Sequence, residues 1–422
     1  MVKRLRAELT LVSLAALLSL PSAAVAQTSL PASVVVDRDM TPAAGVADVL
    51  AVQHLLASVE DQLLPVRLSD TTPAKSALGI AYRIGKWAAL DLPQDSFLMV
   101  AAHEVFGHGA RLRELDATGI GYEFRMPPPY GDGSAATSFD DDLLRTASRA
   151  DRLAIDAAGI EAQNLLADDI AAESLARGSL SYRSAWLYAE SRIAGLLYIR
   201  SVSPQSEPGH DVAAFLSDFN DGCFPPACTP LESQSLKRRA LLMLADPMLA
   251  FSAYAFAASY LVQGRPSSPV PMIPLSHGYW YLPAVGFAMT PYGTELTTDH
   301  YIRAGSRLAK VSVRFGDTGT ARAWGVGVRA NHIAGRNRVA IDLAADIWRQ
   351  PPIDSSTPTA ALATGGLAAA TVRLAIGSAQ TARRVGMLGE IGYKSGGFVP
   401  GERLSAGPVV RIGVAIPLDG IR

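Results

Sequence analysis

Two histidines and a glutamate lie close together in the segment FLMVAAHEVFGHGARLRE, residues 97–114. In the zinc-binding motif H-E-x-x-H, two histidines four residues apart share one helix face. Here His103 and His108 are five apart, so in a regular α-helix their side chains would point about 140° apart. A π-helical turn would bring both to one face, and Gly107 has no side chain to resist it. We therefore predict a metal site on an irregular helix, with two unrelated histidines as the alternative.

A third ligand is needed, because a catalytic zinc usually has three protein ligands and one open position. Glu161, in LAIDAAGIEAQNLLADD, has small or apolar residues at the neighbouring helical positions. A carboxylate buried on such a face must be paired or bound to a metal. We predict Glu161 as the third ligand, and Asp168, further along the same helix, as a residue that orients the ligands.

The hexapeptide HEVFGH resembles the H-E-x-x-G-H signature of the dipeptidyl-peptidase III family of zinc peptidases. In that family both histidines and a glutamate some fifty residues downstream hold the metal, and Glu161 lies 53 residues after His108. The resemblance implies that His103, His108 and Glu161 bind zinc and that Glu104 is the general base. It covers only the hexapeptide and one glutamate, so the family's substrate and specificity are not carried over.

These residues would support zinc-dependent hydrolysis, with Glu104 taking a proton from a water that attacks a metal-polarised carbonyl. Tyr130, in the loop RMPPPYGDGSAATSF, and His210, in SEPGHDVAAF, are weak candidates for donors to the oxyanion. A different assignment stays open. Glu104 and His108 are four residues apart and could chelate one ion together in a regular helix, which would make His103 dispensable.

The N-terminal residues have the features of a secretory signal peptide. A basic start, MVKRLR, precedes an apolar run through Leu20 and an Ala-x-Ala site that ends at Ala26. We predict cleavage after residue 26 and export to the periplasm or outer membrane of a Gram-negative bacterium. In that compartment Cys223 and Cys228 would form a small loop disulfide.

The composition is that of an ordinary folded protein, with 49% hydrophobic residues and a formal net charge of −1. Neither the charge nor its distribution suggests a basic stripe, so we expect no nucleic-acid partner.

The periodicity of apolar residues changes once along the chain. Residues 27–263 are predicted to form a helical domain, because apolar residues recur there three and four apart. A Pro/Ser-rich linker is predicted at residues 264–276. In residues 277–422 the period becomes two, in about eight runs between 279 and 418.

The predicted fold class is α+β: an all-helical, zinc-metallopeptidase-like domain followed by an antiparallel β-meander. We expect the meander to form an eight-stranded outer-membrane-type barrel, with a soluble sheet packed on the helices as the alternative. In a membrane barrel Val339, Ile341 and Leu343 would face lipid, and Asp342 and Asp346 would face inward.

Two classes of function follow from these expectations. The first is an exported zinc-dependent metallohydrolase that acts on a peptide or protein and is held at outer-membrane lipid by its strands. The second is a non-enzymatic barrel protein whose helical domain plugs the barrel or docks a partner.

Overall fold

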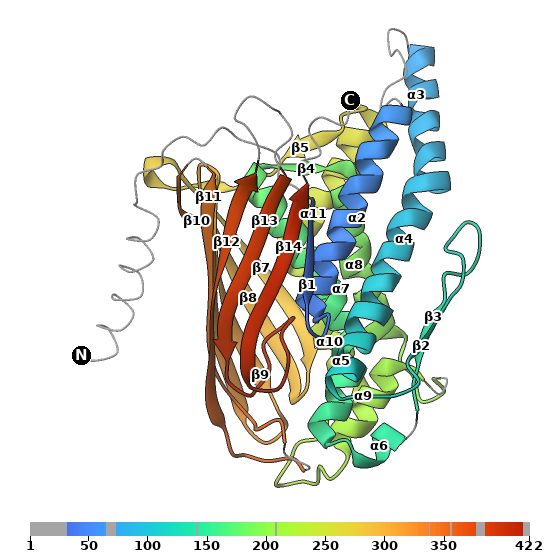
Figure 1. Ribbon diagram of the computed structural model, residues 1–422. Coiled ribbons are helices and arrows are strands. Elements are labelled where there is room, and N and C mark those ends of the chain that lie inside the picture. Colours follow the sequence, from blue (N-terminus) through green and yellow to red (C-terminus); the bar gives the residue numbers. More distant parts are fainter. Residues whose placement is uncertain are drawn as a thin grey trace.

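The computed structural model of the chain describes residues 32–64, 73–140, 142–206, 209–336, 338–354, 357–376 and 385–416. The predicted signal peptide lies outside these residues. One antiparallel sheet curves around one side of a helical bundle whose axes run roughly parallel to the strands (Figure 1). The predicted α+β class is therefore confirmed.

The sheet is built mainly from a meander in which each strand pairs with the next along the chain. Its strands are β7 (Tyr279–Thr290), β8 (Gly293–Ala304), β9 (Arg307–Asp317), β10 (Arg322–Arg336), β11 (Val339–Gln350), β12 (Ala363–Ile376), β13 (Val385–Lys394) and β14 (Gly407–Ile416). These are the eight runs predicted from the period of two. Two further strands, β1 (Ala32–Asp37) beside β14 and β6 (Ile273–Pro274) beside β7, extend the sheet to ten strands.

The prediction of a closed barrel was wrong, because β1 and β6 are the edges of an open sheet within the described residues. The free edge of β1 meets helix α2 (Pro42–Leu63) instead of another strand. The backbone N–H of Val35 in β1 donates to the Asp48 carboxylate on α2 at 2.6 Å. A helix that covers an edge strand satisfies part of its backbone and blocks further pairing.

The bundle contains ten α-helices among the described residues. After α2 they are α3 (Pro73–Lys86), α4 (Leu92–Ala101), α5 (Gly109–Glu114), α6 (Asp142–Thr146), α7 (Arg149–Arg177), α8 (Tyr182–Ser201), α9 (Asp211–Asn220), α10 (Ser233–Ala240) and α11 (Pro247–Ala253). Three π-helical segments, η1 (Trp87–Asp91), η2 (Ala102–His108) and η4 (Tyr254–Val262), continue α3, α4 and α11. Two short 3₁₀ turns are η3 (Leu241–Ala245) and η5 (Ser276–Gly278).

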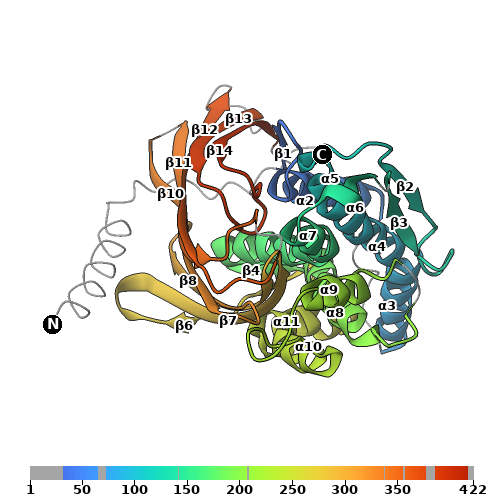
Figure 2. The same ribbon diagram turned by 90° about the horizontal axis from the view of Figure 1, so that it is seen from below.

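The long helix α7 lies at the centre of the molecule, between the sheet and the other helices (Figure 2). It begins with a capping box, in which Ser148 and Asp151 bond each other's backbone N–H groups, and it ends at Gly178 in the left-handed conformation with φ 74°. Both are ordinary helix-ending signals. One hydrophobic cluster includes Leu166 of α7, Met99 of α4 and Tyr301 of β8. The helices and the sheet thus share a core.

The residues predicted as a linker are tied to both parts of the molecule. Within them β5 (Ser267–Pro269) pairs with β4 (Ser179–Ser181), which joins α7 to α8. The following strand, β6, pairs with β7. A separate hairpin, β2 (Gly121–Phe124) with β3 (Ala135–Ser138), lies along the outside of α4 and η2.

The two faces of the sheet carry different side chains. Aliphatic residues point outward and charged residues point inward, which is the arrangement predicted for a membrane barrel. On β11, Val339 and Leu343 are exposed on the outer face, whereas Asp342 is buried on the inner face and pairs with Arg373 at 2.6 Å. Ion pairs continue along the inner face, with Lys310 bonded to Asp168 of α7 at 3.0 Å. The charged inner face therefore joins the sheet to the helices.

Two stretches of helix meet the length and hydropathy expected of a membrane span. They are α2, with 44% of its most apolar window buried, and the sharply bent pair of residues 233–245 and 247–262. By length and composition alone, buried core helices pass the same test.

We expect the buried ion pairs of the inner face to contribute strongly to stability. Arg411 is buried and pairs with Glu402 at 2.7 Å, Asp37 at 3.1 Å and Glu390 at 3.2 Å. The substitution Arg411→Leu leaves buried carboxylates without a cation and should lower the free energy of unfolding by about 3–5 kcal/mol. Denaturant titration measures this loss.

The matched control is Arg322→Leu on the same sheet. Arg322 pairs with Asp317 at 3.2 Å, but its side chain is 82% exposed. We expect a loss of about 0–1 kcal/mol there. Equal losses in the two variants would contradict a structural role for the buried network.

Candidate metal centre

The helix that carries His103 and His108 departs from α-helical geometry between them, as the five-residue spacing predicted. Segment η2 is π-helical, and the N–H of Gly109 bonds to the carbonyl of Glu104, five residues earlier. Gly107 has a role that the sequence did not suggest. A Cβ atom there would lie 2.6 Å from the carbonyl oxygen of Ala158 in α7, so glycine lets η2 pack directly on the backbone of α7.

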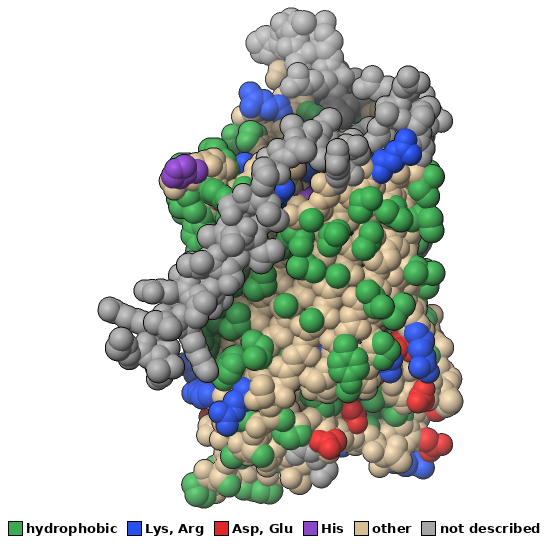
Figure 3. All heavy atoms as spheres, turned by 60° about the vertical axis from the view of Figure 1, so that its left-hand side comes forward, with side chains coloured by type: hydrophobic (Ala, Val, Ile, Leu, Met, Phe, Trp, Pro, Cys, Tyr) green, Lys and Arg blue, Asp and Glu red, His purple; other side chains and the backbone are tan. Residues whose placement is uncertain are grey.

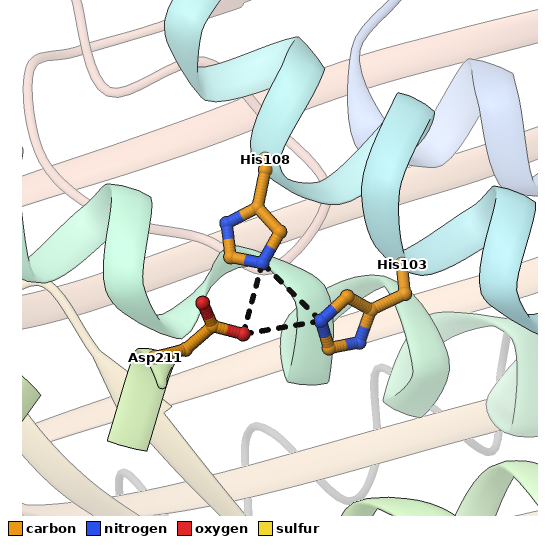
Figure 4. Close-up of side chains that lie close together, drawn as sticks. All are labelled: His103, His108 and Asp211. Atoms are coloured by element: carbon orange, nitrogen blue, oxygen red, sulfur yellow. Dashed lines mark hydrogen bonds and ion pairs between the residues drawn. The ribbon is translucent and has the colours of Figure 1, made fainter. Parts of the chain in front are cut away.

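The two histidines converge with an aspartate from a distant helix (Figure 4). Nε2 of His103 lies 3.2 Å from Nε2 of His108. Oδ2 of Asp211, the first residue of α9, lies 3.2 Å from the former nitrogen and 3.1 Å from the latter. The three donor atoms form a nearly equilateral triangle.

This donor set fits a metal ion. Two nitrogens and one carboxylate oxygen are ordinary zinc ligands, and donors about 2.0–2.1 Å from a tetrahedral ion are about 3.3 Å apart. The side chains of His103, His108 and Asp211 are 12%, 8% and 20% exposed, so the cluster is mostly enclosed and Asp211 is its most exposed member. The group could hold a metal ion with a position left open.

Neighbouring backbone fixes the orientation of both histidines. Nδ1 of His108 lies 2.8 Å from the carbonyl oxygen of Ile155 in α7. A carbonyl only accepts, so Nδ1 carries the proton and the lone pair of neutral His108 is on Nε2, toward the cluster. Beside His103, a Cβ on Gly159 would come within 2.2 Å of Nε2. Only glycine leaves room for that ring at this position.

Without a metal, the cluster is held by an ion pair. Burial disfavours the charged form of His108, but the charge and hydrogen bond of Asp211 outweigh it and raise the pKa of His108 to about 9. Burial also opposes ionisation of Asp211, yet the two imidazoles hold the pKa of its carboxyl far below the usual range. The proton on His108 therefore supplies the positive charge that compensates the Asp211 carboxylate, as a metal ion would.

The predicted general base lies beside the cluster. Glu104 is buried, and its carboxylate accepts a hydrogen bond from Oγ1 of Thr137, in strand β3, at 2.6 Å. Its charge helps to raise the pKa of His108, after the effects of burial and of Asp211. The carboxylate is thus close to the cluster without being one of the three grouped ligands, and the hairpin holds it in place.

The structure does not bring Glu161 into the cluster, and Asp211 lies beside the two histidines where the sequence predicted Glu161. Both Glu161 oxygens accept hydrogen bonds from Nη2 of Arg111, at 2.7 and 2.8 Å, and the backbone N–H of Gly401 donates to one of them at 2.8 Å. Burial of this carboxylate was predicted correctly. Its charge is compensated by an arginine one turn after His108.

Two other predicted site residues lie away from the cluster. Asp168 pairs with Arg192 at 2.7 Å and with Lys310, and it lies about 20 Å along α7 from Ile155. Tyr130 is exposed, and its hydroxyl donates to the carbonyl of Ala89, about 20 Å along the helix from His103. Neither residue is placed to orient a ligand or to stabilise an oxyanion there.

His210, the other candidate donor, does lie next to the cluster, because it immediately precedes Asp211. Its Nε2 is 3.0 Å from Oγ of Ser201, and its ring stacks on Tyr198 with centroids 4.4 Å apart. Tyr198 also approaches His103 edge-on at 6.0 Å, and its hydroxyl accepts the backbone N–H of Asp211 at 3.1 Å. The rings of Tyr198 and His210 therefore lie beside the cluster.

Sequence reasoning missed Asp211, Tyr198, Thr137 and Gly159. The only local signal for Asp211 is its place after Gly-His at the start of an apolar helical pattern, in SEPGHDVAAF. An aspartate there is also an ordinary helix-start residue. Tyr198 and Thr137 have no signal in the sequence, since only the folded chain brings them to the histidines.

The predicted disulfide closes a loop that follows the helix carrying Asp211. Cys223 and Cys228 are bonded and buried, three residues after α9 ends. Asn220, the last residue of α9, exchanges two hydrogen bonds with the backbone of Leu231. These two bonds connect the end of α9 to the segment that leads into α10.

A cavity of about 200 Å³ lies between α4 and the β2–β3 hairpin, one turn before His103. Its lining includes the apolar residues Phe97, Val100 and Phe124 and the charged residues Arg125 and Glu190. The hairpin that lines this cavity also supplies Thr137, which bonds Glu104 beside the cluster.

No family model matches the sequence, and no curated protein or solved structure matches it significantly.

The raised pKa of His108 predicts how metal binding depends on pH. A metal needs the neutral imidazole, so binding must release the proton from His108. Below pH about 9 the apparent dissociation constant should therefore fall about tenfold for each unit by which the pH rises. Competition with a coloured zinc chelator at several pH values measures the slope. An affinity independent of pH between about 6.5 and 8.5 would contradict this assignment.

Proposed function

We propose that this protein is an exported zinc-dependent hydrolase that cleaves peptide bonds, with His103, His108 and Asp211 as the metal ligands and Glu104 as the general base. The observation that carries the proposal is the triangle of donor atoms, with sides of 3.1–3.2 Å, beside a buried carboxylate. Export is the expectation from the N-terminal sequence.

The donor types support zinc as the proposed ion. Two imidazoles and a carboxylate, with one open position, are typical of catalytic zinc sites. Calcium and magnesium favour sites made of oxygen ligands alone, so they fit this donor set less well. The backbone carbonyl that fixes His108 is also the kind of outer contact that zinc-binding histidines have.

A bound zinc ion would polarise the substrate carbonyl and make a water molecule easier to deprotonate. Glu104 accepts a proton from that water as its oxygen attacks the carbonyl carbon. The same carboxyl then gives the proton to the leaving amine as the carbon–nitrogen bond breaks. Thr137 keeps the carboxylate oriented throughout, by donating to one oxygen while the other stays free for the proton.

Peptides are the proposed substrate class for two reasons. The hexapeptide from His103 to His108 resembles a zinc-peptidase signature. In addition, the cavity one turn before His103 has room for one substrate side chain, and both apolar and charged residues line it.

Substitutions at Glu104 and Asp211 test the assigned roles. Glu104→Gln keeps the size of the side chain but removes the proton acceptor, so zinc should stay bound while peptide hydrolysis falls about 10²–10⁴-fold. Asp211→Asn removes the only charged ligand, so zinc should be lost after dialysis against a weak chelator. Zinc content by elemental analysis and cleavage of a fluorogenic peptide library measure the two effects.

The matched control is Asp218→Asn, on the same helix as Asp211 and two turns further on. Asp218 pairs with Arg152 at 2.9 Å and is not one of the grouped ligands. We expect this variant to keep stoichiometric zinc. Retained zinc in Asp211→Asn, or loss of zinc in Glu104→Gln, would overturn the assignment. The second outcome would instead favour chelation by Glu104 and His108.

A further inference from the structure

The outward-facing side chains of β1 and β11–β14 form a surface that we call the aliphatic face. Residues such as Ile391 and Ile412 are 71% and 67% exposed on it. Among the described residues of these strands, the outward rows carry no charged side chain apart from Arg349 at the end of β11. Figure 3 shows this side of the molecule, with hydrophobic side chains over its middle and charged ones toward its lower and upper borders.

This arrangement is the reverse of that in a water-soluble sheet. A soluble antiparallel sheet buries its apolar face and exposes its polar face. On β14, Val410 and Ile412 are exposed while Arg411 between them is buried. An apolar surface that extends over five neighbouring strands is larger than most soluble monomers expose and marks a contact with something apolar.

The height of the aliphatic face matches a bilayer. On β11 it is bounded by Arg338, just before the strand, and Arg349, near its end, and both are exposed. Eleven steps along a strand span about 36 Å, which a tilt of about 40° reduces to about 28 Å. The apolar band of membrane β-proteins is about 25 Å tall.

Aromatic side chains lie at one border of this surface. Phe315 and Trp324 pair across β9 and β10, next to the turn that joins them, and both are exposed. Tyr393, at the same end of β13, is 62% exposed. Aromatic residues of this kind favour the level of the lipid headgroups, where an apolar ring meets water.

Helix α2 continues the aliphatic face beyond the edge of the sheet. Its exposed residues Val52, Leu55, Leu56, Val59 and Leu63 lie three and four apart and so form one stripe. The helix packs beside β1, where the strand's edge is bonded to Asp48. In the view of Figure 2, α2 follows β1 around the outside of the molecule. The stripe occupies the place where further strands would close a barrel.

We propose that the aliphatic face and the stripe on α2 contact the hydrocarbon of a lipid bilayer, so that a sheet closed by a helix replaces a complete barrel. A second copy of the chain is a poorer occupant. The outer face of the sheet is convex (Figure 2), and two convex surfaces touch over a small area, whereas lipid tails cover any curvature. This proposal does not depend on the metal centre.

The position of the aliphatic face also indicates how deep the candidate metal cluster would lie relative to a bilayer. Ala154 of α7, next to the Ile155 that bonds His108, packs against Tyr292 in the turn between β7 and β8. The cluster is therefore level with the ends of the strands. In a bilayer it would lie at the aqueous border, where water and a soluble peptide can reach it.

Lipid contact can be measured residue by residue. The only two cysteines of the chain form a disulfide, so an introduced cysteine is the single free thiol. Ile391→Cys, Ile412→Cys and Val59→Cys would be labelled with a fluorophore in the mature protein reconstituted into phosphatidylethanolamine–phosphatidylglycerol vesicles. We expect lipids with a nitroxide in the tail to quench all three labels. The matched control is Leu144→Cys on α6, exposed to 42% but off this surface, which should not be quenched.

A second measurement, of binding to vesicles, tests the proposal even if a cysteine variant cannot be labelled. Ile391→Arg places a charge in the middle of the aliphatic face and should lower the partition constant for vesicle binding roughly thirty-fold or more, whereas Leu144→Arg should not change it. The proposal would be overturned if the protein without the arginine substitution stayed in the aqueous fraction and its labels were not quenched by the lipids. A stable dimer in detergent-free buffer whose labels are shielded from lipid quenchers would also overturn it, because the occupant would then be a second copy.

Discussion

The i→i+5 hydrogen-bond register of the helix between Ala102 and His108 is the constraint on which the candidate metal centre depends. A regular α-helix would turn the two imidazoles away from each other. The irregular turn is fixed on one side by Gly107, which packs on the backbone of α7. On the other side Thr137 bonds the carboxylate of Glu104. Because these contacts act on one short segment, the same distortion sets both the ligand pair and the neighbouring base.

Helices and strands form one body joined by a buried polar layer. The ion pair between Lys310 and Asp168 links the sheet to α7, and Arg111 links the helix of the candidate metal centre to Glu161 of α7. A sheet with a charged inner face needs such partners, because unpaired buried charges are costly. The helices supply them and also cover the open edge at β1. The fold therefore positions the metal centre through charged contacts as much as through apolar packing.

The sequence predicts the local features well and the distant pairings poorly. Period-two alternation gives the eight strands of the meander and the outward side of Val339, and the spacing of two histidines predicts a π-helical turn. The carboxylate of Glu161 had to be compensated, but a sequence does not reveal whether arginine or metal does so. Asp211 lies about a hundred residues from the histidines and has no local signature. The edge of β1 is covered by α2 through a tertiary hydrogen bond from Val35 to Asp48. The periodicity of the sequence gives no sign of this contact.

The most direct test of the metal centre is an anomalous-difference map, measured at the zinc absorption edge from crystals of the zinc-loaded protein. Our account predicts a single strong peak about 2.0–2.2 Å from Nε2 of His103, Nε2 of His108 and a carboxylate oxygen of Asp211. Glu161 should remain bonded to Arg111. A peak coordinated by Glu161, or no peak between the two imidazoles, would contradict the account.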